Sequence, residues 1–172
     1  MHKMRLCQLK DLAALRDLAI LTYRDTFSHM TGEADLQAYF ETAYSLETLK
    51  AELLNPESEY VVIEANGDLI AYTKLNWHSA QTEARGGDRL EVQRIYVHPD
   101  HKRQGIGMAL LERAYQKALA LGKSYIWLGV WEHNEPAKAF YRNQGFVKVG
   151  SHEFWTGNQL DIDHIMERDL RA

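Results

Sequence analysis

The residues best placed to do chemistry lie in a basic, glycine-containing turn between an expected strand and an expected helix. Leu90–Val97 is rich in β-branched and aromatic residues and alternates in polarity, which predicts a strand, and Pro99 ends it. The turn reads HKRQGIG over residues 101–107, and an amphipathic helix begins within it. A helix N-terminus presents unpaired N–H groups and roughly half a positive charge. The chemistry that this turn offers is therefore the capture of a phosphate or pyrophosphate.

Three features of the turn favour anion binding. No Ser, Thr, Asp or Asn stands where a side-chain cap of the helix is expected. Gly105 and Gly107 let a ligand approach the backbone, and Lys102 and Arg103 add positive charge. A connection with glycines for geometry and basic residues for solubility is an equal alternative on this segment alone. The turn is not a Walker loop, because no Gly-Lys-Ser/Thr follows, and Leu110 replaces the third glycine of a dinucleotide fingerprint.

Two motifs in this part of the chain resemble those of the GCN5-related N-acetyltransferase (GNAT) superfamily. The first is Arg/Gln-x-x-Gly-x-Gly/Ala at the start of a helix, matched by residues 102–107 with Lys102 in place of the usual Arg or Gln. The second is a strand followed by Asn-x-x-Ala-x-x-x-Tyr-x-x-x-Gly-Phe, which residues 134–146 match at every position. The resemblance implies an α/β GNAT fold, with a mixed, mostly antiparallel sheet of six to seven strands, flanked by helices, whose central strands splay apart.

The same resemblance implies where acetyl-CoA binds. The pyrophosphate is expected on the glycine turn, in contact with Lys102, Arg103, Gln104, Gly105, Ile106, Gly107 and Met108. The pantetheine arm would pair like an added strand with Ile95, Tyr96 and Val97, where the splayed strands leave backbone donors and acceptors free. Asn134 would hydrogen-bond to that arm, although capping of its helix explains this residue equally well.

Acetyl transfer to an amine requires a proton for the departing thiolate and a neutral amine as the nucleophile. Tyr141 stands at the position of the family's tyrosine, and its phenol is expected to donate that proton to the sulfur of coenzyme A. A helix tyrosine that only packs its ring is the alternative. Deprotonation is needed because an aliphatic ammonium has a pKa of about 10.

Glu91 is the candidate base for this deprotonation. Strict alternation places Glu91 on the face of its strand that also holds Ile95 and Val97, and a carboxylate there is costly unless it is paired or used. A β-bulge in this strand would change that assignment, and a structural ion pair with a neighbouring arginine is an alternative role. Glu132 and His133 are the next candidates, and deprotonation relayed by water needs no single base.

Composition sets further limits. The chain has 172 residues, of which 45% are hydrophobic and 26% charged, so a single domain over residues 1–172 is expected. A net charge of −4 disfavours a nucleic-acid partner. The single cysteine, Cys7, and the absence of a long apolar run predict a cytoplasmic protein without a membrane partner. His98 and His101 lack a third ligand, so no metal is predicted.

Within the superfamily the chain most resembles the bacterial PaiA-type spermidine/spermine N-acetyltransferases. The supporting stretches are DTF at 25–27, AYFETAY at 38–44, IWLGVWEHNE at 126–135 and the ending at 163–170. This resemblance implies a polyamine acceptor, attacked directly in a ternary complex with acetyl-CoA, and a monomer or homodimer. Two alternatives stay open: acetylation of a protein N-terminus, a lysine or another amine, and a non-catalytic acyl-CoA-binding regulatory module.

The expected acceptor pocket lies near the N-terminal helices. The carboxylates proposed to hold the cationic groups of the acceptor are Glu33, Asp35, Glu41 and Glu132. Ring faces for the same cations are offered by aromatic residues of these helices, namely Phe27, Tyr39, Phe40 and Tyr44.

Periodicity and turn signals predict the elements that must position these residues. In chain order they are a strand at 4–8, a helix at 11–23, a break at 26–32, a helical region at 33–54 interrupted near Ser45, strands at 60–65 and 69–77 joined by an Asn-Gly-Asp turn, a polar loop at 78–88, the strand and helix around the glycine turn, a strand at 124–130, a helix at 134–144, and strands at 146–150 and 163–170.

Overall fold

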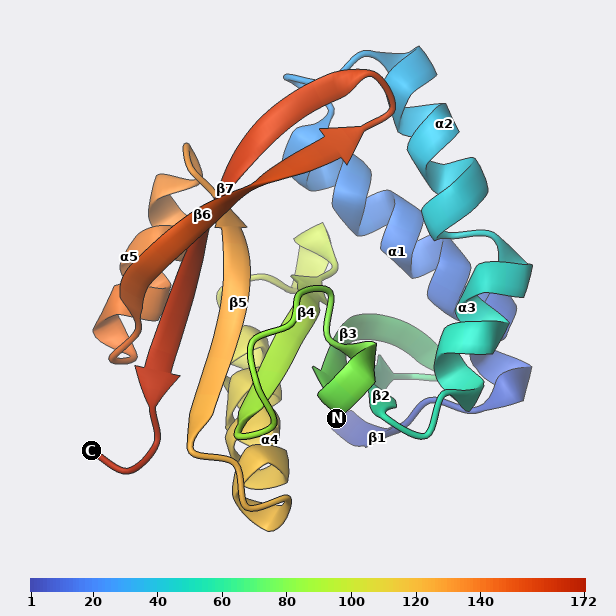
Figure 1. The fold of residues 1–172 in the computed structure, drawn as a ribbon. Coiled ribbons are helices and arrows are strands. Elements are labelled where there is room, and N and C mark those ends of the chain that lie inside the picture. The colour runs from blue at the N-terminus through green and yellow to red at the C-terminus, as the bar shows by residue number, and fades with distance from the viewer.

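The computed structural model describes residues 1–172 as one seven-stranded mixed sheet with helices on both sides (Figure 1). In chain order the elements are β1 (His2–Leu6), α1 (Leu12–Phe27), α2 (Glu33–Ala43), α3 (Leu46–Leu54), β2 (Ser58–Ala65), β3 (Asp68–Trp77), β4 (Arg89–Val97), α4 (Ile106–Ala120), β5 (Tyr125–Trp131), α5 (Glu135–Asn143), β6 (Val147–Thr156) and β7 (Gln159–Asp169). The strand order is β1-β2-β3-β4-β5-β7-β6, and only β4 and β5 run parallel. The predicted fold class is therefore confirmed.

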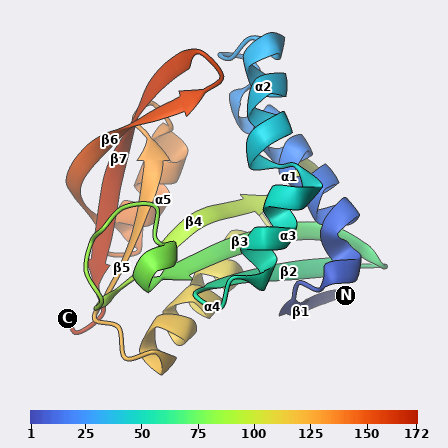
Figure 2. The same cartoon turned by 45° about the vertical axis from the view of Figure 1, so that its right-hand side comes forward.

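The two central strands separate soon after they meet. β4 and β5 pair from Arg89 opposite Tyr125 to Glu91 opposite Trp127, and no pairing continues beyond that point. In Figure 2, β5, β7 and β6 rise away from the plane of β1–β4. The backbone groups of β4 that face β5 after Glu91 are consequently free for another partner.

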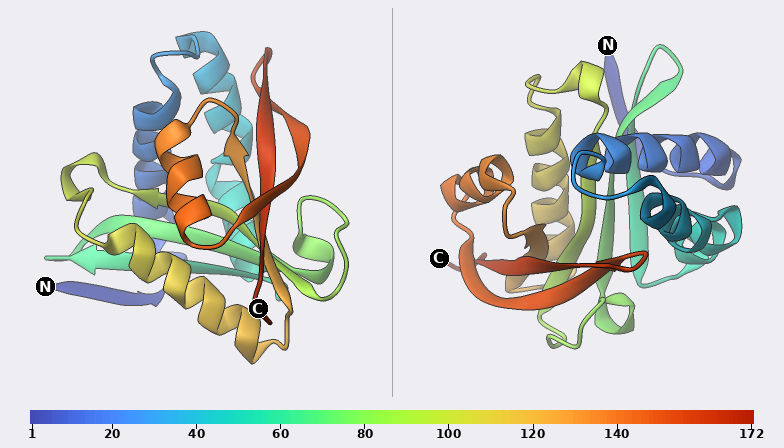
Figure 3. Two further views of the ribbon diagram at one scale, coloured as in Figure 1. Left: turned by 90° about the vertical axis from the view of Figure 1, so that its left-hand side faces the viewer. Right: turned by 90° about the horizontal axis from the view of Figure 1, so that it is seen from above.

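Two layers of helices cover this sheet, with α4 and α5 on one face and α1, α2 and α3 on the other (Figure 3). The stripe predicted for α4 is its buried face: Leu110, Leu111, Ala114 and Ala118 have no exposed surface. On the other face, Leu15, Leu36, Phe40 and Leu49 pack with tyrosines of β2 and β3. None of the helices combines the length and the apolar character that a membrane-spanning helix requires.

A β-bulge in β4 overturns the strict alternation expected for this strand. The pairing with β3 shifts by one residue next to positions 74 and 75, which leaves Gln93 without a partner. Ile95 and Val97 therefore pack toward α4. Glu91 is the cross-strand partner of Asn76 on β3, and its side chain lies on the opposite face of the sheet. The expectation that Glu91 shares a face with Ile95 and Val97 is wrong.

Local signals place most turns correctly. Asn66 and Gly67 form a two-residue hairpin turn with φ values of 55° and 85°, which the Asn-Gly pair predicts. Ser45 interrupts the second helical region by capping α3, since its hydroxyl accepts a hydrogen bond from the Thr48 N–H at 3.1 Å. β1 begins two residues earlier than predicted, and α1 continues to Phe27, beyond the predicted end at residue 23.

The C-terminal hairpin differs most from the prediction. β6 and β7 also take up residues 151–156 and 159–162, which were expected to be a connection. The prediction missed them because both strands are only partly buried and lack a clear apolar face. The tip of the hairpin reaches α1 and α2 (Figure 1). The Asn158 N–H donates to Asp35 Oδ1 at 2.9 Å, and the hydroxyl oxygens of Tyr23 and Thr156 lie 2.6 Å apart. The hairpin thus bridges the two halves of the molecule.

Candidate active site

A cavity of about 590 Å³ opens where β4 and β5 splay. Its walls come from α1, α2, β4, the glycine turn, β5, α5 and the C-terminal hairpin. The lining includes the predicted residues Ile95, Tyr96, Val97, Lys102, Arg103, Gly105, Ile106, Gly107, Met108, Asn134 and Tyr141. Two predicted residues, Gln104 and Glu91, are not part of it.

At one end of the cavity, here called the donor end, the glycine turn presents backbone N–H groups. Gly105 precedes α4 with φ 76°, a left-handed conformation that favours glycine, and no side chain caps the helix. The helical hydrogen bonds begin with the Ala109 N–H, which donates to the Gly105 carbonyl at 3.0 Å. The N–H groups of Ile106, Gly107 and Met108 therefore have no acceptor in the helix. These residues fit a diphosphate.

Positive charge gathers at the same end. Lys102 and Arg103 line the cavity, and Lys102 Nζ lies 2.7 Å from Asp25 Oδ2 on α1. A Cβ atom built on Gly107 would meet no protein atom within 4 Å, so the space above this residue is open. The turn thus combines free backbone donors, cationic side chains and room for a ligand.

The unpaired edge of β4 forms the next part of the donor end. Ile95, Tyr96 and Val97 line the cavity and follow the point at which β5 departs. Because β3 occupies only one edge of β4, backbone groups on the other edge face the cavity. An extended ligand can pair with such an edge as an added strand.

α5 supplies two further predicted residues. The Asn134 side chain caps this helix, since its Oδ1 accepts a hydrogen bond from the Ala137 N–H at 3.3 Å, and its amide nitrogen has no protein partner. Tyr141 is 8% exposed and lines the cavity. Burial raises the pKa of Tyr141 well above its ordinary value, so its phenol keeps a proton to donate.

Glu91 occupies a buried position with its carboxylate fully engaged. Its Oε1 accepts hydrogen bonds from Asn76 Nδ2 at 2.9 Å and from the Thr82 N–H at 2.8 Å, and its Oε2 accepts one from the Thr82 hydroxyl at 2.5 Å. Glu91 is 3% exposed and does not line the cavity, whereas Gln93 does. These contacts tie β4 to β3 and to the loop at 78–88, and the role of Glu91 as a base stays a prediction.

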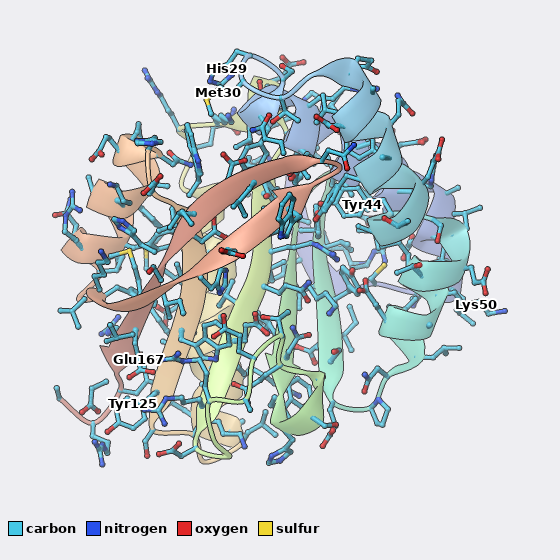
Figure 4. All side chains as sticks on the ribbon, turned by 45° about the horizontal axis from the view of Figure 1, so that its top comes forward. His29, Met30, Tyr44, Lys50, Tyr125 and Glu167 are labelled. Carbon is cyan, nitrogen blue, oxygen red and sulfur yellow. The ribbon has the colours of Figure 1, made fainter.

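The opposite part of the cavity, here called the acceptor end, is built from aromatic side chains of distant elements. Tyr23 of α1 stacks on Tyr39 of α2 with ring centroids 4.5 Å apart, and Phe154 of β6 lies 5.9 Å from Tyr39. Figure 4 shows Tyr44 where α2 leads into α3, and Lys50 farther out on α3. The aromatic residues expected in the pocket that do line it are Phe27, Tyr39 and Tyr44, while Phe40 belongs to the core.

The carboxylates predicted for the acceptor end lie outside the cavity. None of the four acids proposed for this role lines the cavity, namely Glu33, Asp35, Glu41 and Glu132. Glu33 instead pairs with Arg24, and Asp35 accepts the hydrogen bond from the hairpin tip. The one carboxylate in the lining is Asp163 of β7, which lies in a stretch singled out for its resemblance but not as a site residue.

The histidines considered for a metal site have local contacts. His98 Nδ1 accepts a hydrogen bond from the Asp100 N–H at 3.1 Å and so caps the short turn before the glycine loop. Its ring centroid lies 5.7 Å from that of His101. Nowhere in the structure do three or more His, Cys, Asp or Glu side chains gather into a group that could hold a metal ion.

Comparison with known proteins gives the family. The model of the acetyltransferase (GNAT) family matches residues 13–146. An uncharacterized N-acetyltransferase in the pepI 3′ region of Lactobacillus delbrueckii subsp. lactis is 32% identical over 161 residues, which cover 94% of this chain and 93% of that protein. The L-amino acid N-acyltransferase MnaT of Escherichia coli (strain K12) is 31% identical over 121 residues, or 63% of this chain and 67% of that protein.

A solved structure supports the fold. The PaiA N-acetyltransferase from Thermoplasma acidophilum in complex with coenzyme A matches with a TM-score of 0.81 and 22% identity, over 98% of this chain and 99% of that chain. The family match spans most of the chain, and the glycine turn and Tyr141 line the same cavity. The chain belongs to the acetyltransferase (GNAT) family and is an acetyl-CoA-dependent N-acetyltransferase.

Proposed function

We propose that this enzyme acetylates a primary amine of a small cationic molecule, with the polyamines spermidine and spermine as the first candidates. The observation that carries the proposal is one continuous cavity, with an anion-binding turn at its donor end and an aromatic, carboxylate-bearing acceptor end. Acetyl-CoA and an amine can therefore occupy it together, which suits direct attack in a ternary complex.

For the donor we propose two kinds of contact. The pyrophosphate of acetyl-CoA would rest on the N–H groups at the start of α4, with Lys102, Arg103 and Gln104 beside it. The pantetheine arm would pair with the free edge of β4 at residues 95–97 and reach the unoccupied amide nitrogen of Asn134. Met108 would complete the wall beside the turn.

For the chemical step we propose Tyr141 as the general acid. The amine nitrogen attacks the thioester carbonyl, so a C–N bond forms and the C–S bond breaks. Tyr141 gives its proton to the departing thiolate and recovers one from solvent, while the ammonium formed on the amine loses its extra proton. Glu91 remains the candidate base for that loss, and it would act at a distance because it does not line the cavity.

The enclosure of the acceptor end supports a small acceptor. The hairpin that carries Phe154 into the lining is joined to α1 and α2 by the Tyr23–Thr156 and Asn158–Asp35 contacts. Stacked rings of Tyr23 and Tyr39 offer faces to a slender cation. A folded protein presenting an N-terminus or a lysine fits such a covered site less well.

One observation favours a second acceptor class, the free amino acids. Arg94 lines the cavity with its guanidinium over the Tyr44 ring at 5.0 Å, and only its Nη1 bonds to Glu52 and Tyr60. The remaining guanidinium donors would suit a carboxylate on the acceptor. The relative MnaT carries the name of an L-amino acid N-acyltransferase.

The test is a thiol-release assay with acetyl-CoA and four acceptors: spermidine, a mono-amine of similar length, a free amino acid and a lysine-containing peptide. Spermidine should give the highest specificity constant, and its KM should rise with ionic strength more than that of the mono-amine because salt screens the additional charges. Equal specificity constants and equal salt responses for the two amines would reject the polyamine. The best turnover with the amino acid would select the second class.

We also propose a cytoplasmic enzyme that acts as a monomer or homodimer. Light scattering coupled to size exclusion would separate these two states by mass. A larger assembly would contradict this proposal.

A further inference from the structure

We propose that Asp163 binds the ammonium group of the acceptor, and that His152 and Glu83 are positioning residues that fix the orientation of its carboxylate. This inference deepens the proposed function and rests on it. It assigns the acceptor contact to the C-terminal hairpin and to the loop at 78–88, where the sequence predicted no site residue.

Asp163 is the one acidic side chain in the lining of the cavity. It is the only Asp or Glu among the lining residues, while the other charged or ionisable groups with nitrogen atoms there are Arg94, His101, Lys102 and Arg103. An ammonium group that leaves water needs a negative partner, since an unpaired buried charge is costly. Asp163 is therefore the one side chain of the lining that can supply this partner.

The Asp163 carboxylate is held from behind by a histidine. His152 of β6 is the direct cross-strand partner of Asp163, and its Nε2 lies 3.3 Å from Asp163 Oδ2. Its other ring nitrogen, Nδ1, contacts the carboxylate of Glu83 in the loop at 78–88. Hydrogen bonding to these two acids raises the pKa of His152 to about 8, so at neutral pH the ring is protonated and donates to both.

A glycine on the neighbouring strand makes room for this pair. A Cβ atom built on Gly129 of β5 would lie 3.3 Å from both Asp163 Oδ2 and His152 Nε2, closer than side chains normally pack. Gly129 itself lines the cavity. The carboxylate and the imidazole therefore lie directly against the β5 backbone at the cavity wall, and a methyl group at residue 129 would push them by a few tenths of an ångström.

Asp163 occupies the correct wall for an acceptor. Its cross-strand partner on β5 is Trp131, which also lines the cavity. The hairpin that holds Asp163 also carries Phe154 into the aromatic acceptor end. One Asp163 oxygen is used by His152, which leaves the other free to accept a hydrogen bond from an amine.

The experiment compares Asp163→Asn with Asp161→Asn in steady-state thiol release. Asp161 lies two residues away on β7, accepts a hydrogen bond from Gln159 and does not line the cavity, so it is a matched control for the loss of charge. Asp163→Asn should raise the KM for the amine about 30-fold, the range expected for loss of one charged hydrogen bond. The KM for acetyl-CoA should be unchanged in both variants, and Asp161→Asn should keep the KM of the native enzyme for the amine.

The positioning residues should give smaller changes of the same kind. We expect Glu83→Gln and His152→Gln to raise the KM for the amine about fivefold, in line with the loss of one orienting hydrogen bond. Gly129→Ala should also raise this KM without removing any polar group. A purely structural role would lower the melting temperature and leave the ratio of the two KM values unaltered. If Asp163→Asn does not fold, Glu83→Gln, in a surface loop, provides the same comparison.

The outcomes separate this inference from the proposed function. Turnover of an amine by the native enzyme, with equal amine KM values in Asp163→Asn and Asp161→Asn, would overturn the inference and leave the function standing. No turnover of any amine by the native enzyme would overturn the proposed function and this inference with it.

Discussion

The two ends of the cavity are built in different ways. The donor end comes from two short segments, residues 95–97 and residues 102–108 without Gln104, and its groups are mainly backbone N–H and C=O. The acceptor end is assembled from single side chains of α1, α2, β6 and β7, such as Tyr23, Tyr39, Phe154 and Asp163. A site made by a continuous backbone segment can serve every member of a fold family, whereas a site made of separate side chains can change by single substitutions. We therefore expect the shared chemistry at the donor end and acceptor specificity in the hairpin and the N-terminal helices.

The largest effect is expected from Gly107→Val at the donor end. The new side chain meets no protein atom within 4 Å of its Cβ, so the fold should be preserved, but it enters the space above the start of α4. Loss of two hydrogen bonds to a charged phosphate, at ~1.7 kcal/mol each, should weaken acetyl-CoA binding about 300-fold in calorimetry. Gly105→Val is a poorer test because φ 76° at that residue would strain any β-branched side chain.

The matched control for this change is Gly87→Val. Gly87 also has open space around its Cβ and a φ outside the left-handed region, but it lies outside the cavity. Its acetyl-CoA affinity should equal that of the native enzyme. Unchanged affinity in a folded Gly107→Val variant would show that the glycine turn does not bind the donor.

Tyr141→Phe tests the proposed general acid, which lines the cavity. The change keeps the ring and removes the proton, so kcat should fall about 100-fold, the scale of general acid catalysis, with acetyl-CoA affinity unchanged. Tyr115→Phe is the control, since this tyrosine of α4 is also buried but lies outside the cavity. If chemistry is rate-limiting and the two variants have equal kcat values, Tyr141 is not the general acid and only packs in the core.

Glu91→Gln distinguishes a base from a structural acceptor. The carboxylate accepts three hydrogen bonds and does not line the cavity, so we expect the free energy of unfolding to fall by about 1–3 kcal/mol and kcat to stay within a few-fold. Denaturant titration and steady-state kinetics measure the two quantities. A fall in kcat of about 100-fold in a stable variant would instead establish Glu91 as the base. Glu132→Gln, on the partly exposed residue after β5, should alter neither.

The smallest effect is a pH dependence of hairpin stability. The folded-state pKa of His152 is raised to about 8 by Asp163 and Glu83, so its stabilisation is complete below the ordinary pKa of 6.5 and is lost as the pH rises through 8. After allowance for partial exposure this amounts to about 1 kcal/mol, or a melting temperature about 2–4 °C lower at pH 8.5 than at pH 6. His152→Gln should abolish this difference.

The native protein must be compared with His152→Gln because a buried lysine titrates in the same pH range. Burial lowers the pKa of Lys74 to about 8, and stability should rise with pH between this value and the ordinary value for lysine. This opposite trend is common to the native protein and to His152→Gln, so it cancels in their difference. An equal pH response of the two proteins would contradict the His152 contacts.

Apart from Gln104, the residues predicted for the donor end line the cavity, whereas the carboxylates predicted for the acceptor end do not, and the difference has a physical reason. The glycine turn, the Asn-Gly hairpin and the α4 stripe each depend on neighbouring residues, so local patterns were sufficient. The bulge at Gln93 left no local signal, and it moved Glu91 to the face opposite Ile95. Asp163 enters the cavity because a long, half-exposed hairpin folds back onto α1 and α2, and such strands lack the apolar alternation that predicts them.

The most direct test of the division between donor and acceptor ends is a kinetic cycle with Gly107→Val, Asp163→Asn and the double variant. Thiol release would be measured with acetyl-CoA and the best amine of the panel, each varied at saturation of the other. We predict that Gly107→Val raises only the KM for acetyl-CoA, that Asp163→Asn raises only the KM for the amine, and that the double variant shows both changes multiplied without coupling. A rise of both KM values in either single variant would contradict the account.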